Sequence, residues 1–146
     1  MTDWLDNLER PVRRKRKRVG KAKDADGRSE REIQRGIVKD LRRMGYIVTH
    51  VPMGELLQRG SPEARMRRAA RMEADGCVFG WPDLLIFRSR KRGGPEWGLL
   101  EIKRPGQALE PRQKGLADML AEHGAKVGAA CCSDTMVETL RRWQWL

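Results

Sequence analysis

Long apolar runs are missing from this sequence of 146 residues. None approaches the roughly 20 residues that a membrane-spanning helix needs, and the N-terminal segment has no apolar stretch of the signal-peptide type. The mean hydropathy is −0.71, and 35% of the residues are charged. We therefore expect a soluble intracellular protein, in the cytoplasm or in a host-cell cytoplasm if viral, and not a secreted one. The length favours one domain with a sizeable core.

Cysteine is also scarce. The three cysteines are Cys77, Cys131 and Cys132, and their spacing matches no metal-ligand motif. Without a secretion signal, a disulfide framework is not expected. We interpret the three side chains as reduced thiols that pack like small apolar groups.

Positive charge, in contrast, is abundant. The formal charge is +11 and the pI is about 10.3, which indicates a polyanionic partner, most simply DNA. Residues 1–23 carry nine basic and three acidic side chains, so the rest of the chain is basic too. Crowded like charges predict a flexible arm over residues 1–28. Such an arm is either an inert solvated tail or, as we favour, a nonspecific contact to phosphates.

The remaining residues, 29–146, show alternating helix and strand patterns. Ser29 is a predicted helix N-cap and Gly45 a helix stop. The expected inward side chains of this first helix are Ile33, Ile37, Leu41 and Met44. The predicted helices are 29–45, 62–76, 109–124 and 133–143; the predicted strands are 46–51, 80–87, 98–104 and 125–132; residues 52–61 are a predicted loop. The order α-β-α-β-β-α-β-α predicts an α/β fold with helices on both faces of one mixed sheet.

Two apolar strands carry acidic residues. The first, "GWPDLLIF", contains Asp83, and the second, "GLLEIKR", contains Glu101 and Lys103. Alternation along a strand places Glu101 and Lys103 on one face. Alone, this pair would be a simple ion pair. A hairpin centred near position 92 or 93, however, brings Asp83 opposite about Ile102 and so close to Glu101. The two carboxylates would repel each other unless a cation lay between them.

A hard divalent cation suits this arrangement. Mg²⁺ prefers a few carboxylate oxygens, water and substrate phosphate oxygens. Asp83, Glu101 and the carbonyl of Ile102 are the predicted protein ligands, with Mn²⁺ as the alternative ion. Such a metal activates water for attack on a phosphodiester, and Lys103 would orient that water or stabilise charge on the phosphate.

The motif "PD" followed by "EIK" resembles the PD-(D/E)xK phosphodiesterases, which have a restriction-endonuclease-like core. The segments "SEREIQRGIVKDLRRMGYIV", "ARMEADGCVFGWPDLLIF" and "LLEIKRPGQALEPRQKGLADMLAEHGAKVG" resemble the virus-type replication-repair nuclease family, VRR-NUC, from about Ser29 to Trp143. The resemblance implies Asp83 and Glu101 as metal ligands, Lys103 as the catalytic lysine and Gln113 as a supporting residue. It also implies a homodimer, with two active sites for two strands.

The family places a further acid in the first helix, and Glu30 and Glu32 are the candidates here. Glu30 shares a stripe with Gln34, Ile37 and Leu41, so we favour Glu30. The chain departs from many relatives in having Trp81 before the Pro-Asp pair and Met53-Gly54 in place of Asn-Gly. His50 is interpreted as structural rather than as a proton-transfer residue, and Trp81 as a packing residue rather than a DNA contact.

The sequence therefore predicts a metal-dependent DNA endonuclease that selects branched or junction DNA. Candidate phosphate contacts lie in the second helix and in the hairpin loop: Arg68, Arg71, Arg90, Lys91 and Arg92. Two alternatives stay open. One is a non-enzymatic basic DNA-binding protein on a nuclease fold, which the intact set of site residues disfavours. The other is a nuclease with a flap, nicking or RNA preference.

Overall fold

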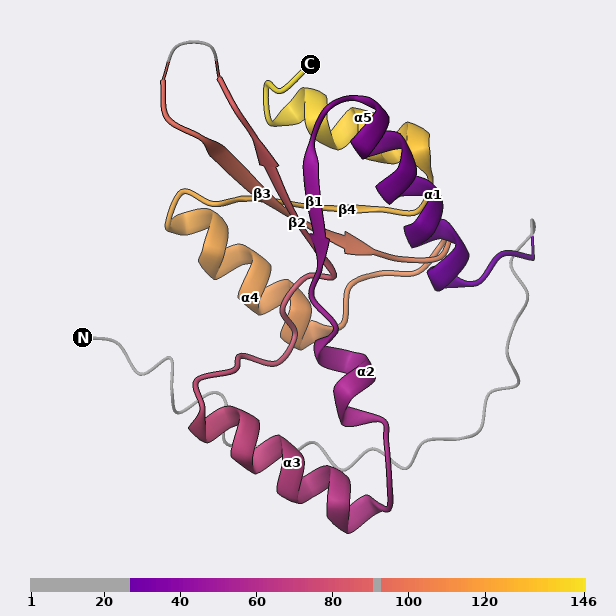
Figure 1. Ribbon diagram of the computed structural model, residues 1–146, viewed down its shortest axis with the longest axis vertical. Coiled ribbons are helices and arrows are strands. Elements are labelled where there is room, and N and C mark those ends of the chain that lie inside the picture. The colour runs from indigo at the N-terminus through magenta and orange to yellow at the C-terminus, as the bar shows by residue number, and fades with distance from the viewer. Residues whose placement is uncertain (1–26, 91–92) are drawn as a thin grey trace.

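A computed structural model describes residues 27–90 and 93–146 (Figure 1). The strands are β1 (Ile47–His50), β2 (Leu84–Arg88), β3 (Glu96–Ile102) and β4 (Lys126–Ala130), and the helices are α1 (Glu30–Arg43), α2 (Met53–Leu57), α3 (Pro62–Ala74), α4 (Pro111–Glu122) and α5 (Ser133–Arg142). Apart from Gly27 and Arg28, the predicted arm lies outside the described residues. Among the described helices, none is long and apolar enough to cross a membrane.

The sheet is mixed, in the order β1-β2-β3-β4. β1 and β3 both pair antiparallel with β2, and β3 pairs parallel with β4. Helices cover both faces, with α1 and α5 on one face and α4 on the other (Figure 1). This α/β architecture with a restriction-endonuclease-like core confirms the predicted fold class.

The main core lies between the sheet and the α1–α5 layer. Ile33, Ile37 and Leu41 of α1 are buried against alternate side chains of β2 and β3. Met44, which was predicted to face inward, is 41% exposed, because the helix ends at Arg43 and the chain turns away at Gly45. The predicted Ser29 cap is confirmed, as its hydroxyl accepts from the Glu32 N–H at 3.3 Å.

Two glycines let α5 approach the sheet closely. A Cβ on Gly128 would lie 2.4 Å from Thr139 Cγ2, and one on Gly98 would lie 2.6 Å from Trp143 Cζ3. Real side chains do not tolerate such separations, so both positions need glycine at this helix–sheet spacing.

The predicted loop over residues 52–61 was wrong in part, since it contains α2. This helix has five residues, too few for a helical repeat to show in the sequence. α2 leads into α3, which has no buried residue and stands apart from the sheet (Figure 1). The cap of α3 was predicted correctly, because Ser61 Oγ accepts from the Ala64 N–H at 3.2 Å.

All three cysteines are half-buried free thiols rather than fully buried core groups. The interpretation that they pack like small apolar groups of the core holds only in part, because none of the three is fully buried.

Candidate active site

The predicted acidic residues meet at one end of the sheet. β2 begins directly after Asp83, and Leu84 pairs with Leu100 of β3. One step further along the ladder, Asp83 stands opposite Glu101. The predicted register, with Asp83 opposite Ile102, was wrong by one residue, because the loop between two antiparallel strands fixes their register and its conformation cannot be read from its length alone.

Alternation places the acids on the face that α4 covers. Leu100 and Ile102 are buried in the α1–α5 core, so Glu101 between them points to the opposite side of the sheet. Glu101 is only 4% exposed, which is unusual for a carboxylate. Partners that hold its charge must therefore lie close by.

Two side chains converge on one oxygen of Glu101. Lys103 Nζ lies 2.8 Å from Oε1, and Gln113 Nε2 donates to the same atom at 2.6 Å. Gln113 is itself fixed, because its Oε1 accepts from the Glu110 N–H at 3.0 Å at the start of α4. The first turn of α4 thereby orients the carboxylate, and Lys103 supplies a nearby positive charge.

Asp83 is held by the backbone of both neighbouring strands. Its Oδ2 accepts from the Ile102 N–H at 2.8 Å, and its main-chain carbonyl accepts from the Val51 N–H, also at 2.8 Å. These bonds lock the position of Asp83 between the end of β1 and the end of β3. The second oxygen of each acid, Asp83 Oδ1 and Glu101 Oε2, takes no part in the bonds described above.

The two carboxyl groups disfavour each other's ionisation. Burial, and next the negative charge of Asp83, raise the pKa of Glu101 to about 7, although Lys103 and Gln113 oppose the rise. Burial also raises the pKa of Asp83, against the effect of the Ile102 N–H. The buried Glu101 and the half-buried Asp83, both with a raised pKa, form a site on adjacent strands that gains from a bound cation.

The donor set fits a hard cation that keeps part of its water shell. Within residues 27–90 and 93–146, no three His, Cys, Asp or Glu side chains gather closely enough to hold a metal by themselves. A pair of carboxylates is nevertheless typical of a magnesium site completed by substrate phosphate and water, whereas zinc requires a fuller protein shell. The pair is therefore suited to a divalent cation shared with a phosphate-bearing substrate.

Comparison with known families agrees with this chemistry. The model of the VRR-NUC domain matches residues 28–134, well over half of the chain. The chain belongs to the VRR-NUC family. Neither the curated proteins nor the solved structures contain a match to it. VRR-NUC domains are nuclease domains that act on DNA and generally depend on divalent metal ions.

The two candidate acids of the first helix have different surroundings in this VRR-NUC domain. Glu32 accepts from the N–H and the hydroxyl of Ser29, each at 2.7 Å, and so completes a capping box. Glu30 Oε1 accepts from the Gln107 amide at 2.9 Å, in the amide orientation that the neighbours of Gln107 favour. Glu30 therefore lies beside the loop that follows β3, while Glu32 is engaged at the helix end.

The predicted phosphate contacts are scattered. Arg68 Nη1 donates to the carbonyls of Leu56 and Arg59, at 2.9 and 2.7 Å, and so ties α2 to α3. Arg71 is exposed on α3. Arg90 lies 3.2 Å from Glu96. Positions 91 and 92 lie outside the described residues, so the prediction for Lys91 and Arg92 has no structural counterpart.

Glu55 of α2 was missed in the sequence. Its charge acts on Asp83 and raises the pKa of that carboxyl, while His50 lowers it. Glu55 also lies 4.0 Å from Arg31 of α1. No sequence signal indicated this acid, because its helix is too short to show periodicity. Trp81, two residues before Asp83, is half-buried, which is compatible with its interpretation as a packing residue.

Proposed function

We propose that this chain is a Mg²⁺-dependent DNA endonuclease that hydrolyses phosphodiester bonds. Its proposed active-site residues are Asp83, Glu101 and Lys103. The observation that carries the proposal is the pair of acids on adjacent strands, the buried Glu101 and the half-buried Asp83, with Lys103 Nζ 2.8 Å from Glu101. If the role of Glu101 were purely structural, its ion pair with Lys103 would be enough. A second carboxylate beside it costs stability unless the site binds a cation.

Each residue has a distinct task in this proposal. Asp83, Glu101 and the carbonyl of Ile102 would hold the metal, for which Mn²⁺ is the alternative ion. The bound ion supplies charge stabilisation at the phosphoryl group and lowers the pKa of a water ligand. Gln113 keeps Glu101 oriented, and Lys103, whose side chain is 14% exposed, presents a cation toward the scissile phosphate. Glu30 is the proposed acid of the first helix.

We propose that the substrate is branched or junction DNA and that the enzyme works as a homodimer. A net charge of +11 supports contacts to phosphates, which sense the path of the backbone rather than the base sequence. Cutting two strands of a junction requires two active sites, and a symmetric dimer provides them. Light scattering of the free protein and of its junction complex tests the dimer.

A cleavage assay tests the activity. Labelled duplex, flap, single-stranded and four-way-junction DNA are incubated with Mg²⁺, Mn²⁺ or EDTA. The matched pair of variants is Lys103→Ala and Lys114→Ala; Lys114 is an exposed lysine of α4 that pairs with Asp118. Metal-dependent cutting, fastest on the junction, is expected from the wild type and from Lys114→Ala.

Lys103→Ala should lose about 100-fold or more in cleavage rate, as expected for a group that stabilises developing charge, while its DNA binding persists. Tight binding without cutting in either metal would contradict the enzyme and favour a DNA-binding protein. Equal loss in both variants would remove Lys103 from the chemistry.

A further inference from the structure

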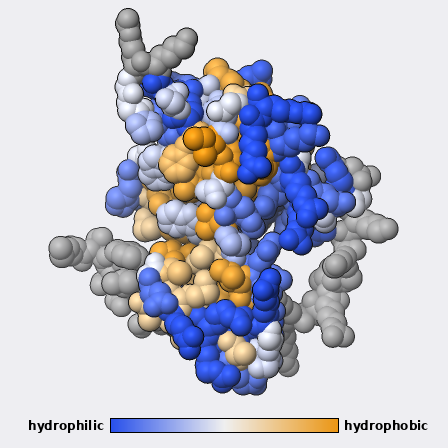
Figure 2. All heavy atoms as spheres, in the orientation of Figure 1, coloured by the Kyte–Doolittle hydropathy of each residue, from blue (hydrophilic) through white to orange (hydrophobic). Residues whose placement is uncertain are grey.

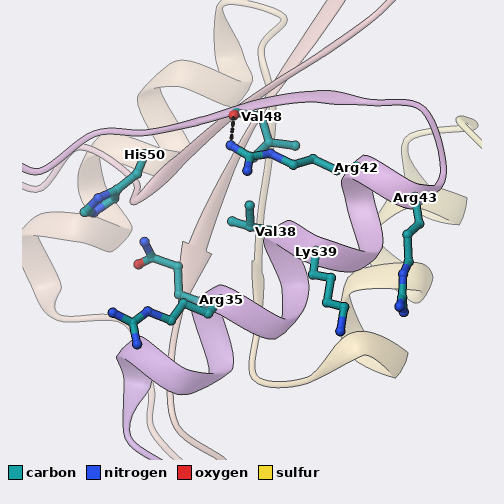
Figure 3. Close-up of a pocket in the computed structure, with 8 residues that line it drawn as sticks. Arg35, Val38, Lys39, Arg42, Arg43, Val48 and His50 are labelled. Carbon is teal, nitrogen blue, oxygen red and sulfur yellow. Dashed lines mark hydrogen bonds between the residues drawn. The ribbon is translucent and has the colours of Figure 1, made fainter.

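A groove lined by basic side chains runs between α1 and the edge strand β1 (Figure 3). Its volume is about 630 Å³, which is ample for several linked phosphate groups. It is separate from the acid pair and contains none of the phosphate contacts predicted from the sequence. We call it the basic groove, lined by Gln34, Arg35, Val38, Lys39, Arg42, Arg43, Val48 and His50.

Helical spacing explains why the cations share one side. Positions 35, 39, 42 and 43 are separated by 4, 3 and 1 residues, so their side chains form one stripe along α1. The buried stripe, with Ile33, Ile37 and Leu41, lies on the opposite side of the helix and fixes its rotation on the sheet. The basic side chains consequently face solvent: Arg42 reaches toward β1, whereas Lys39 and Arg43 point away from it (Figure 3). Figure 2 shows hydrophilic side chains gathered over the α1 side of the molecule.

One cation is anchored over the edge strand. Arg42 Nη2 donates to the Val48 carbonyl at 3.4 Å, as the dashed line in Figure 3 shows. Val38 and Val48 supply apolar surface beside it. One wall of the groove is therefore the edge strand β1, and Arg42 is fixed to the backbone of that strand.

The other cations have little to neutralise them. None of the eight lining residues is acidic. Among the described residues, Arg35 and Lys39 form no ion pair within 4.0 Å, and Arg43 has only a 3.7 Å contact with Asp40, which lies on its own helix. A groove lining with four cations and no acid suits a repeating anion better than a single one.

The groove leads to the acid pair. The chain reverses between α1 and β1, so β1 runs back along the helix and ends at His50, at the same end of the groove as Arg35 (Figure 3). The following residue, Val51, donates its N–H to the Asp83 carbonyl at 2.8 Å, and the charge of His50 acts on Asp83. From Arg43 to Arg35 the helix rises by about 12 Å, which matches three to four nucleotides at about 3.4 Å each.

We propose that the basic groove binds the phosphate backbone of one DNA strand and directs that strand to Asp83 and Glu101. The inference rests on the proposed nuclease function and adds the path of the substrate. It assigns the main backbone contacts to α1, where Arg35 and Lys39 are exposed and form no ion pair among the described residues, whereas Arg68 and Arg90 have partners within the protein. The lining has no Phe, Tyr or Trp for stacking, so binding should depend mainly on phosphate charge and little on base identity.

Binding measured without catalysis tests the groove. The double variant Arg35→Gln/Lys39→Gln removes two exposed charges, and Arg65→Gln/Arg67→Gln removes two exposed charges from α3 as the matched control. Fluorescence anisotropy in EDTA gives the affinity for labelled single-stranded and duplex DNA over a range of salt concentrations. Arg42 is left unchanged because it bonds to Val48. Circular dichroism melts confirm that both variants fold.

The groove variant should lose about tenfold or more in affinity near 0.1 M salt. The slope of log K against log salt should also decrease by about 0.9 per lost contact on duplex DNA, or about 0.7 on a single strand. The form of DNA, single-stranded or duplex, for which the groove variant loses more affinity is the form that enters the groove. The α3 control should change by less than about threefold.

An unchanged affinity in the groove variant, an equal loss in the control, or no DNA binding by the wild type would overturn the groove. The nuclease proposal fails separately. A wild type that binds through the groove but cuts no DNA with any metal contradicts the activity and leaves the groove in place. If the wild type cuts DNA and the groove variant binds DNA normally, the groove is contradicted and the nuclease activity stands.

Discussion

Gln113 joins the start of α4 to the acid pair: its amide nitrogen donates to Glu101 Oε1 at 2.6 Å while its amide oxygen accepts from the Glu110 N–H at 3.0 Å. Because both bonds lie within the protein, we propose that Gln113 acts by positioning Glu101. Removing such a supporting partner typically costs about 10- to 100-fold in metal affinity or activity.

Gln113→Ala should therefore lower the cleavage rate about 10- to 100-fold and weaken metal binding, with DNA affinity in EDTA unchanged. The metal concentration that gives half-maximal cleavage is the decisive measurement, since a purely structural loss would not move it. Gln113→Glu keeps a helix-capping group but adds a third carboxylate, so its metal dependence should differ from that of Gln113→Ala. A normal metal requirement in both variants would remove Gln113 from the site.

Mutations of Glu30 and Glu32 should affect different properties, cleavage for Glu30 and stability for Glu32. Glu32 closes the capping box with Ser29, so Glu32→Ala should destabilise the fold by about 1 kcal/mol and retain cleavage. Glu30→Ala should lower cleavage with little change in stability, because Glu30 faces the Arg104–Gln107 loop after β3. Urea unfolding and junction cleavage of both variants check the pair. Loss of cleavage in Glu32→Ala alone would reverse the assignment made from the helical stripe.

The sequence carried enough information for most of the elements and for the core of the site. Helix caps such as Ser29 and Ser61 are local signals, and their hydrogen bonds form within one turn. Strand alternation was enough to place Glu101 and Lys103 together, because the two-residue period is fixed by the backbone. The family motif then supplied Gln113, whose contact with Glu101 spans 12 positions and has no periodic signature.

What could not be predicted depends on tertiary geometry. The register of β2 and β3 is set by the loop between them, and the prediction was wrong by one residue. The basic groove could not be predicted because its second wall, with Val48 and His50, is formed only once β1 lies beside α1. The arginines of α3 looked more prominent in the sequence, where an exposed cation and one bonded to backbone carbonyls, such as Arg68, look the same.

Gly128 should not tolerate a larger residue. An alanine Cβ would lie 2.4 Å from Thr139 Cγ2, so α5 or β4 must shift. Gly128→Ala should destabilise the protein by about 1 to 3 kcal/mol. Thr139→Ser removes the clashing methyl and keeps the hydroxyl that donates to the Thr135 carbonyl at 2.9 Å, so it should restore much of that loss in the double variant.

Gly115→Ala is the control for the glycine substitution, because a Cβ there meets nothing within 4 Å on α4. It should stabilise the protein by about 0.4 to 1 kcal/mol. Urea unfolding of the four variants measures the set. If Gly128→Ala is as stable as the wild type, the close approach of α5 to β4 is wrong.

The raised pKa of Glu101 predicts how stability depends on pH in the absence of metal. The folded-state pKa is about 7 and the ordinary value is 4.5, so between these values the folded protein retains a proton that the unfolded chain has released. Stability from this group is complete below about pH 4.5 and declines as the pH rises to about 7, by on the order of 3 kcal/mol. Asp83, whose pKa is also raised, acts in the same direction.

Urea unfolding in EDTA should therefore show lower stability near pH 8 than near pH 5, and Glu101→Gln should remove most of that difference because its amide does not titrate. A divalent cation should reverse the trend. By binding the ionised pair of the folded state alone, it adds about 2.7 kcal/mol at 100 times its Kd, and the gain should appear near pH 8 and vanish near pH 5. A gain that is equal at both pH values, or that persists in an Asp83→Asn/Glu101→Gln variant, would place the cation elsewhere than between the two acids.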